Sequence, residues 1–262
     1  MKSGYYIVAL IILAMPHVAV GQGADVAPVP TSPAVEELSE ALPDIATRSG
    51  ISKTIKWLAI VTVLSLAPAI LVMVTSFTRM VVVLGLLRQA LTTHQLPPNQ
   101  VLFGLALLMT LVVMAPVYQD VHASAIGPYF DGQISRQEAI HAGEARVRTF
   151  MIHQIEGGDN ADDVYLFLPE DVAGRQDLAW HDVPTLSLIP AFVISELKIA
   201  FMMGFRIFLP FLVIDMLVAS VLVSMGMLML PPVLISLPFK LLLFVLADGW
   251  HLVVGTLMSS FG

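Results

Sequence analysis

The sequence predicts an all-α protein that associates with membranes, and its composition supports this in two ways. Hydrophobic residues make up 57% of the 262 residues and charged residues only 13%, about half the charged share usual in a soluble domain. The apolar residues also lie in runs of a length typical of membrane helices. The chain has no cysteine, which excludes disulfides, thiolate metal sites and cysteine nucleophiles. The net charge of −7 argues against nucleic-acid binding, which favours basic surfaces.

Residues 1–21 have the pattern of a cleaved signal peptide. A lysine precedes an apolar stretch that ends in Ala19-Val20-Gly21, and its small residues fit a signal-peptidase site. An uncleaved first membrane helix is the alternative, but the stretch is short for a span and Pro16 interrupts it. Residues 22–50 are rich in Pro, Ala and Glu, a composition typical of a flexible tether.

Residues 51–118 are expected to form a first helical hairpin. Trp57–Thr78 are 22 residues without a charge, and a helix of about 33 Å is long enough for a hydrocarbon core of about 30 Å. Pro68 predicts a kink in this helix. Val101–Val117 is the second apolar segment, and Pro97-Pro98-Asn99 predicts its start because proline is tolerated in the first helical turn.

Residues 119–188 are expected to form a soluble, acidic helical insert. Positions 119–182 hold twelve acids and four arginines, and Ser135-x-x-Glu138 has the pattern of a helix capping box. The connection between the two preceding apolar segments carries Arg79 and Arg88 without an acid. The positive-inside rule places that connection in the cytoplasm and the insert on the exoplasmic side.

Residues 189–262 are expected to form a second helical hairpin with a C-terminal helix. Gly226 and Pro231-Pro232 interrupt the apolar sequence and predict the turn. A group of methionines precedes the two prolines, and flexible apolar side chains in a bent segment could form a soft hydrophobic constriction. The alternative is ordinary helix packing. The methionines are Met225, Met227 and Met229.

Single charges interrupt the apolar helices of this second hairpin. An unpaired ion in such surroundings is unfavourable, so each should face protein, a partner charge or water rather than lipid. Their spacing does not pair them within one helix, so we expect ion pairs between helices or between subunits. They are Glu196, Lys198, Arg206, Asp215, Lys240 and Asp248.

The sequence contains no catalytic motif that we could identify. Asp215 and Asp248 could form the carboxylate dyad of an intramembrane aspartyl protease, but no Gly-x-Gly precedes Asp248. His-Glu-x-x-His, a phosphate loop and Gly-x-Ser-x-Gly are also absent. We therefore expect neither an enzyme nor a cofactor or metal site.

Linked motifs run through both apolar regions. They are Pro68–Arg79 (PAILVMVTSFTR), Gly85–Arg88, Pro97–Val101, Gly104–Leu107, Pro190–Lys198 (PAFVISELK), Phe211–Asp215, Ala219–Leu222, Met225–Pro232 (MGMLMLPP), Leu237–Lys240 and Asp248–Trp250. In these motifs the chain resembles the FliP/SctR family of type III secretion export-gate proteins, and its flagellar branch in particular. The resemblance covers residues 57–118 and 189–258.

The resemblance implies a non-enzymatic subunit of the protein-conducting pore at the base of the flagellum, in the bacterial inner membrane and on its periplasmic side. It implies a pentameric ring with FliQ and FliR, with FlhA and FlhB nearby. Unfolded flagellar proteins would be the exported substrates. The family's helices wind into a conical pore that lies largely above the bilayer, although hydropathy predicts transmembrane segments.

The resemblance also assigns roles to individual residues. It places Met227, Leu228 and Met229, with Met225 beside them, in a gasket that closes the pore, and it places Glu196 and Lys240 at a contact between subunits. Arg206, Asp215 and Asp248 are further candidates for buried charges. Some positions depart from the family: Leu228 stands within a run that is often three methionines, and Arg206 stands where the family is commonly apolar or neutral. The turn at 92–95 and the acidic stretch around 159–163 also differ.

Two alternatives stay open. The first is the injectisome homologue of the same family. The second, more distant, is a subunit of an ion-coupled transporter or channel, with Glu196, Asp215 and Arg206 lining a path. Such transporters usually have two similar halves, which this sequence lacks.

The signal peptide makes the first prediction. Intact-mass measurement of protein extracted from membranes should give an N-terminus at or near Gln22, because cleavage follows the small residue at position 21. Recovery of the form that begins at Met1 alone would contradict it.

Overall fold

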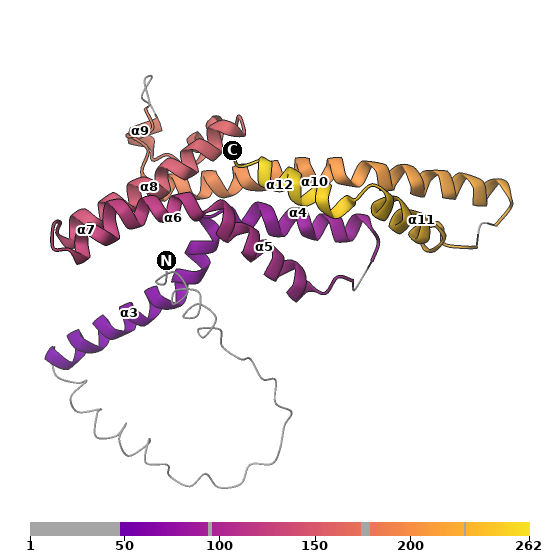
Figure 1. Cartoon of the computed structure of the whole chain (residues 1–262). Coiled ribbons are helices and arrows are strands. Elements are labelled where there is room, and N and C mark those ends of the chain that lie inside the picture. The colour runs from indigo at the N-terminus through magenta and orange to yellow at the C-terminus, as the bar shows by residue number, and fades with distance from the viewer. Residues whose placement is uncertain (1–47, 94–95, 174–178, 228) are drawn as a thin grey trace, which may run out of the picture. The chain divides into compact units, whose positions relative to one another are not determined.

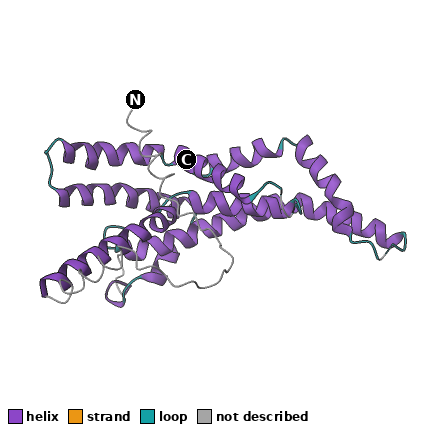
Figure 2. Cartoon of the chain, turned by 90° about the horizontal axis from the view of Figure 1, so that it is seen from below, coloured by secondary structure: helices purple, strands orange, loops and turns teal. Residues whose placement is uncertain are grey.

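The computed structural model describes residues 48–93, 96–173, 179–227 and 229–262, and every regular element in these ranges is helical (Figures 1 and 2). The expected all-helical class is therefore confirmed for the described residues. The expected signal peptide, residues 1–21, and nearly all of the expected tether lie outside them. Residues 63–262 form one compact unit.

The first expected membrane helix ends before its apolar sequence does. Helix α3 (Arg48–Met73) ends before Thr78, and α4 (Phe77–Ala90) begins after a short turn. The Thr75 hydroxyl donates to the Val72 carbonyl at 3.2 Å and accepts the Phe77 amide at 3.5 Å. Side-chain bonds of this kind compete with the helical pattern, so the expected continuous helix over residues 57–78 is wrong at its C-terminal end.

The second apolar segment begins as predicted and then bends. Helix α5 (Asn99–Val113) starts directly after Pro98, and α6 (Ala115–Val121) follows with a proline in its first turn. A π-helical turn, η1 (His122–Ile126), and α7 (Gly127–Phe130) complete this arm. Proline cannot donate the next helical hydrogen bond, which accounts for a bend of 52° between α5 and the helices after it.

The capping box of the acidic region is confirmed. Helix α8 (Arg136–Gly157) begins after Ser135, whose amide donates to a Glu138 carboxylate oxygen at 2.7 Å while its hydroxyl accepts the Glu138 amide at 3.3 Å. The bond from the Ser135 amide, and after it a side-chain hydrogen bond of Ser135, lower the pKa of the Glu138 carboxyl group. The 3₁₀ segment η2 (Ala161–Phe167) and α9 (Glu170–Ala173) follow.

A single helix of 40 residues, α10 (Thr185–Ser224), joins several of the apolar runs. After a turn in which Gly226 has a φ of +75°, α11 (Pro232–Leu246) and α12 (Gly249–Ser259) return along α10 (Figure 1). Residues 189–262, expected to form a second hairpin, thus hold most of α10 together with α11 and α12. Among the described residues, α10 is long and apolar enough to cross a membrane, and up to three segments are if each bent pair, α5 with α6–α7 and α11 with α12, counts as one span.

Helix α4 forms the centre of the core. It packs against α10 and α5, and Met80, Val83, Leu84 and Leu87 along it are fully buried with Leu257 of α12. Burying one such side chain stabilises the fold by about 1.5–3 kcal/mol.

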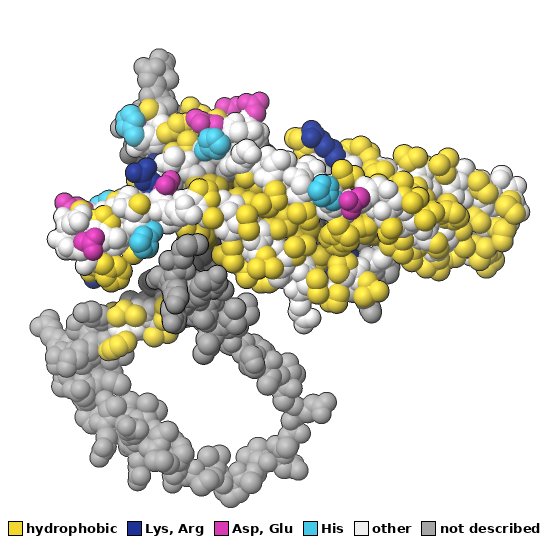
Figure 3. Space-filling model, viewed as in Figure 1, with side chains coloured by type: hydrophobic (Ala, Val, Ile, Leu, Met, Phe, Trp, Pro, Cys, Tyr) yellow, Lys and Arg dark blue, Asp and Glu magenta, His cyan; other side chains and the backbone are white. Residues whose placement is uncertain are grey.

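Many large apolar side chains remain exposed on the other faces. Hydrophobic side chains cover the visible face over α10–α12, whereas acidic side chains gather over the α7–α9 end (Figure 3). Large exposed apolar surfaces mark membrane or protein contacts.

The corner between α11 and α12 makes a packing prediction. A methyl group on Gly249 would lie 2.2 Å from two ring atoms of Phe244, whereas one on Gly255 in the same helix would meet nothing within 4 Å. Gly249→Ala should lower the free energy of unfolding by about 1–3 kcal/mol through overpacking. Gly255→Ala, the matched control, should be neutral or stabilising by about 0.5–1 kcal/mol. Thermal unfolding of the purified protein in detergent measures both, and equal melting temperatures would contradict the packing.

Candidate functional site

Helix α4 carries a fully buried arginine. Arg79 lies in its first turns with 1% of its side chain exposed. The positive-inside argument needed Arg79 in an aqueous connection, so that part of the orientation argument is wrong. The orientation argument then depends on Arg88 alone. Its Nη1 donates to the Asn99 side chain.

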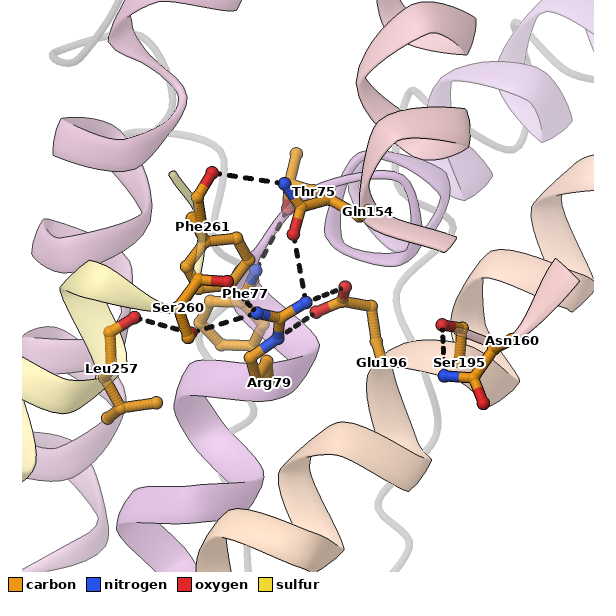
Figure 4. A network of polar contacts seen from close by, with 10 residues as sticks. All are labelled: Thr75, Phe77, Arg79, Gln154, Asn160, Ser195, Glu196, Leu257, Ser260 and Phe261. Atoms are coloured by element: carbon orange, nitrogen blue, oxygen red, sulfur yellow. Dashed lines mark hydrogen bonds and ion pairs between the residues drawn. The ribbon is translucent and has the colours of Figure 1, made fainter. Parts of the chain in front are cut away.

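Five acceptors surround the Arg79 guanidinium (Figure 4). Its Nε and Nη2 donate to the two Glu196 carboxylate oxygens at 2.8 and 2.5 Å. Nη1 donates to the Ser260 carbonyl at 2.8 Å and hydroxyl at 2.9 Å, and Nη2 also donates to Gln154 Oε1 at 3.1 Å. The Phe261 ring lies 3.9 Å from the guanidinium carbon. Arginine has five N–H donors, so this buried cation is fully satisfied.

These bonds join segments that are far apart in the sequence. Arg79 comes from α4, Gln154 from α8 and Glu196 from α10, while Ser260 and Phe261 follow α12. Gln154 also donates from Nε2 to the Phe261 carbonyl at 3.3 Å. We call these five residues the Arg79 network, and it fixes one end of the α10–α12 hairpin to the rest of the fold.

A second buried ion pair lies further along α10. Lys240 of α11 is fully buried, and its Nζ donates to Asp215 Oδ2 at 2.6 Å and to the Ala90 carbonyl at 3.3 Å. The Ser236 hydroxyl donates to the other Asp215 oxygen. Ala90 is the last residue of α4, and a cation is favourable at the C-terminal end of a helix.

A third ion pair ties α10 to the acidic region. Lys198 Nζ lies 2.5 Å from Asp163 Oδ1 in η2, and Asn160 Nδ2 donates to the Ser195 hydroxyl at 3.0 Å. The Lys198 side chain is about half exposed, so water weakens this pair relative to the other two.

The expected ion pairs between helices are therefore present, but their partners were not predicted. Glu196 binds Arg79, and Lys240 binds Asp215. Glu196 and Lys240 each have an ionic partner within the chain. A pairing of the two across neighbouring subunits stays a prediction. Asp215 is only partly buried.

Arg206 and Asp248 differ from the expectation of buried charges, because both side chains are exposed in the chain. The contact of the Arg206 guanidinium is with the Met202 sulfur at 3.6 Å. Asp248 lies between α11 and α12 in a left-handed conformation, with a φ of +49°. Intramolecular packing does not bury either charge.

The methionine loop connects α10 to α11. Met225, Met227 and Met229 expose 66%, 42% and 96% of their surface, so their side chains make little contact with the core. Leu228 lies outside the described residues. Closure of a pore by these side chains stays a prediction.

Sequence reasoning missed Arg79 and Gln154 as members of a site. One signal in the sequence points to Arg79: it stands directly before the unbroken apolar run Met80–Leu87, and several residues of that run are buried. Gln154 carries no such signal, because polar residues are common along α8.

Comparison with known proteins bears on the same region. A family model described as "FliP family" matches residues 60–257. The chain is 49% identical over 211 residues to the flagellar biosynthetic protein FliP of Bacillus subtilis, covering 80% of this chain and 93% of that protein. It is 48% identical to the protein of that name from Caulobacter vibrioides, covering 83% and 80%. It is 49% identical to the one from Pectobacterium carotovorum, covering 79% of each.

The buried pair of Arg79 and Glu196 makes a prediction on stability. Arg79→Met or Glu196→Met alone should lower the free energy of unfolding by about 3–5 kcal/mol, because each leaves one buried charge uncompensated. The double variant should lose much less than the sum. Lys198→Met, which removes the half-exposed cation opposite the buried Asp163, should lower stability less than either single variant, because water reaches this pair through Lys198. Thermal unfolding in detergent measures the four stabilities of this double-mutant cycle. If the two single losses simply add in the double variant, Arg79 and Glu196 do not form the pair.

The same cycle on Glu196 and Lys240 tests the contact between subunits. If Glu196 of one copy pairs with Lys240 of the next, Glu196→Lys with Lys240→Glu should restore ring assembly that either variant alone abolishes, as read by native gel. The pairs within the chain instead predict no rescue, because each reversal faces a like charge, Arg79 or Asp215. Assembly lost equally in the double variant would leave only the intramolecular pairs.

Proposed function

The chain belongs to the FliP family, and we propose that it is a subunit of the flagellar type III secretion export gate. In this role it helps to form the pore through which unfolded polypeptides are exported, and it catalyses no reaction. The observation that carries the proposal is the hairpin of α10 and α11, whose tip presents exposed methionines beyond a shaft joined by a buried ion pair.

The tip and the shaft have different physical properties that suit a gate. The Lys240–Asp215 pair joins α10 to α11, and the loop beyond it contains flexible thioether side chains with few contacts of their own. Five copies around an axis, the number that the family resemblance implies, would bring these tips to one level. A narrow ring of apolar side chains resists water and ions, yet methionine repacks around chains of different shape.

The proposed partners are those that the resemblance implies. Further copies of this chain, FliQ and FliR would cover the exposed apolar faces of α10–α12, with FlhA and FlhB nearby. Buried apolar faces of this kind are typical of obligate assemblies. We place the protein in the bacterial inner membrane at the flagellar basal body, with the acidic region of α7–α9 on the periplasmic side.

The proposed gate predicts that ions leak through the pore when the methionine side chains of the loop are truncated. Met227→Ala with Met229→Ala should widen and wet the constriction, so ion conductance of cells that express the variant should rise and growth under ionic stress should fall. Replacement by Leu should have a milder effect, because leucine restores an apolar side chain of similar volume. Assembly on native gels should persist.

The matched control is Met216→Ala, an exposed methionine on the shaft of α10 rather than at its tip. It should leave conductance unchanged. Normal conductance in an assembled double-alanine variant would place the constriction elsewhere in the chain.

A further inference from the structure

In the described part of the α10–α12 hairpin, one cation and one anion form no ion pair within the chain. Among the described residues of these helices and their connections, three charges of α10 and Lys240 of α11 are taken up by the ion pairs given above. The two left without an ionic partner are Arg206 and Asp248. Both lie in apolar surroundings, where an unpaired charge is unfavourable, and their signs are opposite.

Arg206 lines a cavity with a volume of about 740 Å³, formed by α4, α8, α10, α12 and the residues after α12. Arg79 and Gln154 also line this cavity. Its walls are largely apolar and include Ile199, Met202 and Leu252. The Met202 sulfur is the polar atom that Arg206 contacts, and a thioether is only a weak acceptor. Among the described residues, the Arg206 guanidinium therefore has no strong hydrogen-bond acceptor.

Asp248 has the complementary properties. It lies at the corner where α11 and α12 meet at 63°, next to Val245 and Leu246, which expose 73% and 76% of their surface. The packing of Phe244 against Gly249 and the Trp250 ring, at 5.6 Å between ring centroids, holds this corner in shape. The corner is thus a fixed apolar protrusion that carries one carboxylate.

The two features lie at similar heights along α10. Phe244 at the corner lies 6.4 Å from Phe211 of α10, measured between ring centroids. Phe211 is five residues from Arg206, or about 7.5 Å along a helix. Two copies that stand side by side with a small axial offset therefore bring the corner of one to the height of the cavity of the other.

We propose that Asp248 of one copy binds Arg206 of the next copy, with the corner seated at the cavity. The contact is head-to-tail, because it uses two different surfaces, and such contacts repeat around a closed ring. It rests on the proposed assembly of several copies. A carboxylate and a guanidinium away from water also set the register between neighbours and disfavour wrong ones.

Charge reversal tests the contact in the full chain expressed with its partners. Arg206→Glu should reduce the assembled fraction at least about tenfold, because it places two like charges together. Arg206→Glu with Asp248→Arg should restore most of it. Arg206→Glu with Asp131→Arg, a reversal of another exposed acid, which follows α7, is the matched control and should not. Rescue by the control variant, or none by the first, overturns the proposal.

Crosslinking gives a second measurement that does not depend on stability. The chain has no cysteine, so Arg206→Cys and Asp248→Cys introduce the only thiols. An arginine–aspartate pair holds backbones further apart than the roughly 7 Å limit of a disulfide, so a short bismaleimide is the reagent. The double-cysteine chain should form a ladder of covalent oligomers, and each single variant should stay monomeric.

The outcomes separate this contact from the proposed function. If the parent chain assembles with its partners but shows neither the ladder nor the rescue, the contact is wrong and the function stands. Loss of bound anionic phospholipid in Arg206→Met, without a ladder in the double-cysteine chain, would assign the cavity to a lipid headgroup and also overturn the contact. If the parent chain does not assemble with its partners, the proposed function is wrong, and the contact that rests on it is wrong as well.

Discussion

The structure depends on one buried cation. Removing a guanidinium from water costs several kcal/mol, and only close geometry with complete hydrogen bonding offsets this. Arg79 meets both conditions, since its five N–H groups find acceptors in Glu196, Gln154 and Ser260. Every one of these groups must be in place at once, so α4, α8, α10 and the residues after α12 take up a single relative arrangement.

The second ion pair extends this constraint along the hairpin. Glu196 and Asp215 are both in α10, 19 residues apart, which corresponds to about 28 Å along a helix. Arg79 fixes the first position to α4, and Lys240 fixes the second to α11 and to the end of α4. The α10–α11 hairpin is therefore joined to the core at two heights, while the methionine loop beyond them has no comparable contact.

Local features were the ones that the sequence could predict. The start of α5 after Pro98, the capping box of Ser135 and the turn at Gly226 each follow from residues within a few positions of one another. The end of α3 was missed because it depends on bonds of the Thr75 hydroxyl within an apolar run. The partners of Glu196 and Lys240 were missed because they lie 117 and 25 residues away in the chain. A single sequence identifies a charge that needs a partner, but tertiary packing decides which partner it finds.

The length of α10 has a consequence for a newly made copy. A helix of 40 residues is about 60 Å long, roughly twice the thickness of a hydrocarbon core, and large apolar side chains are exposed from Leu186 at its start to Val223 at its end. A bilayer can solvate only part of that surface, and water solvates none of it favourably. A solitary copy therefore has an apolar area that only other protein can cover. In the proposed assembly, insertion into the membrane and oligomerisation are therefore thermodynamically coupled.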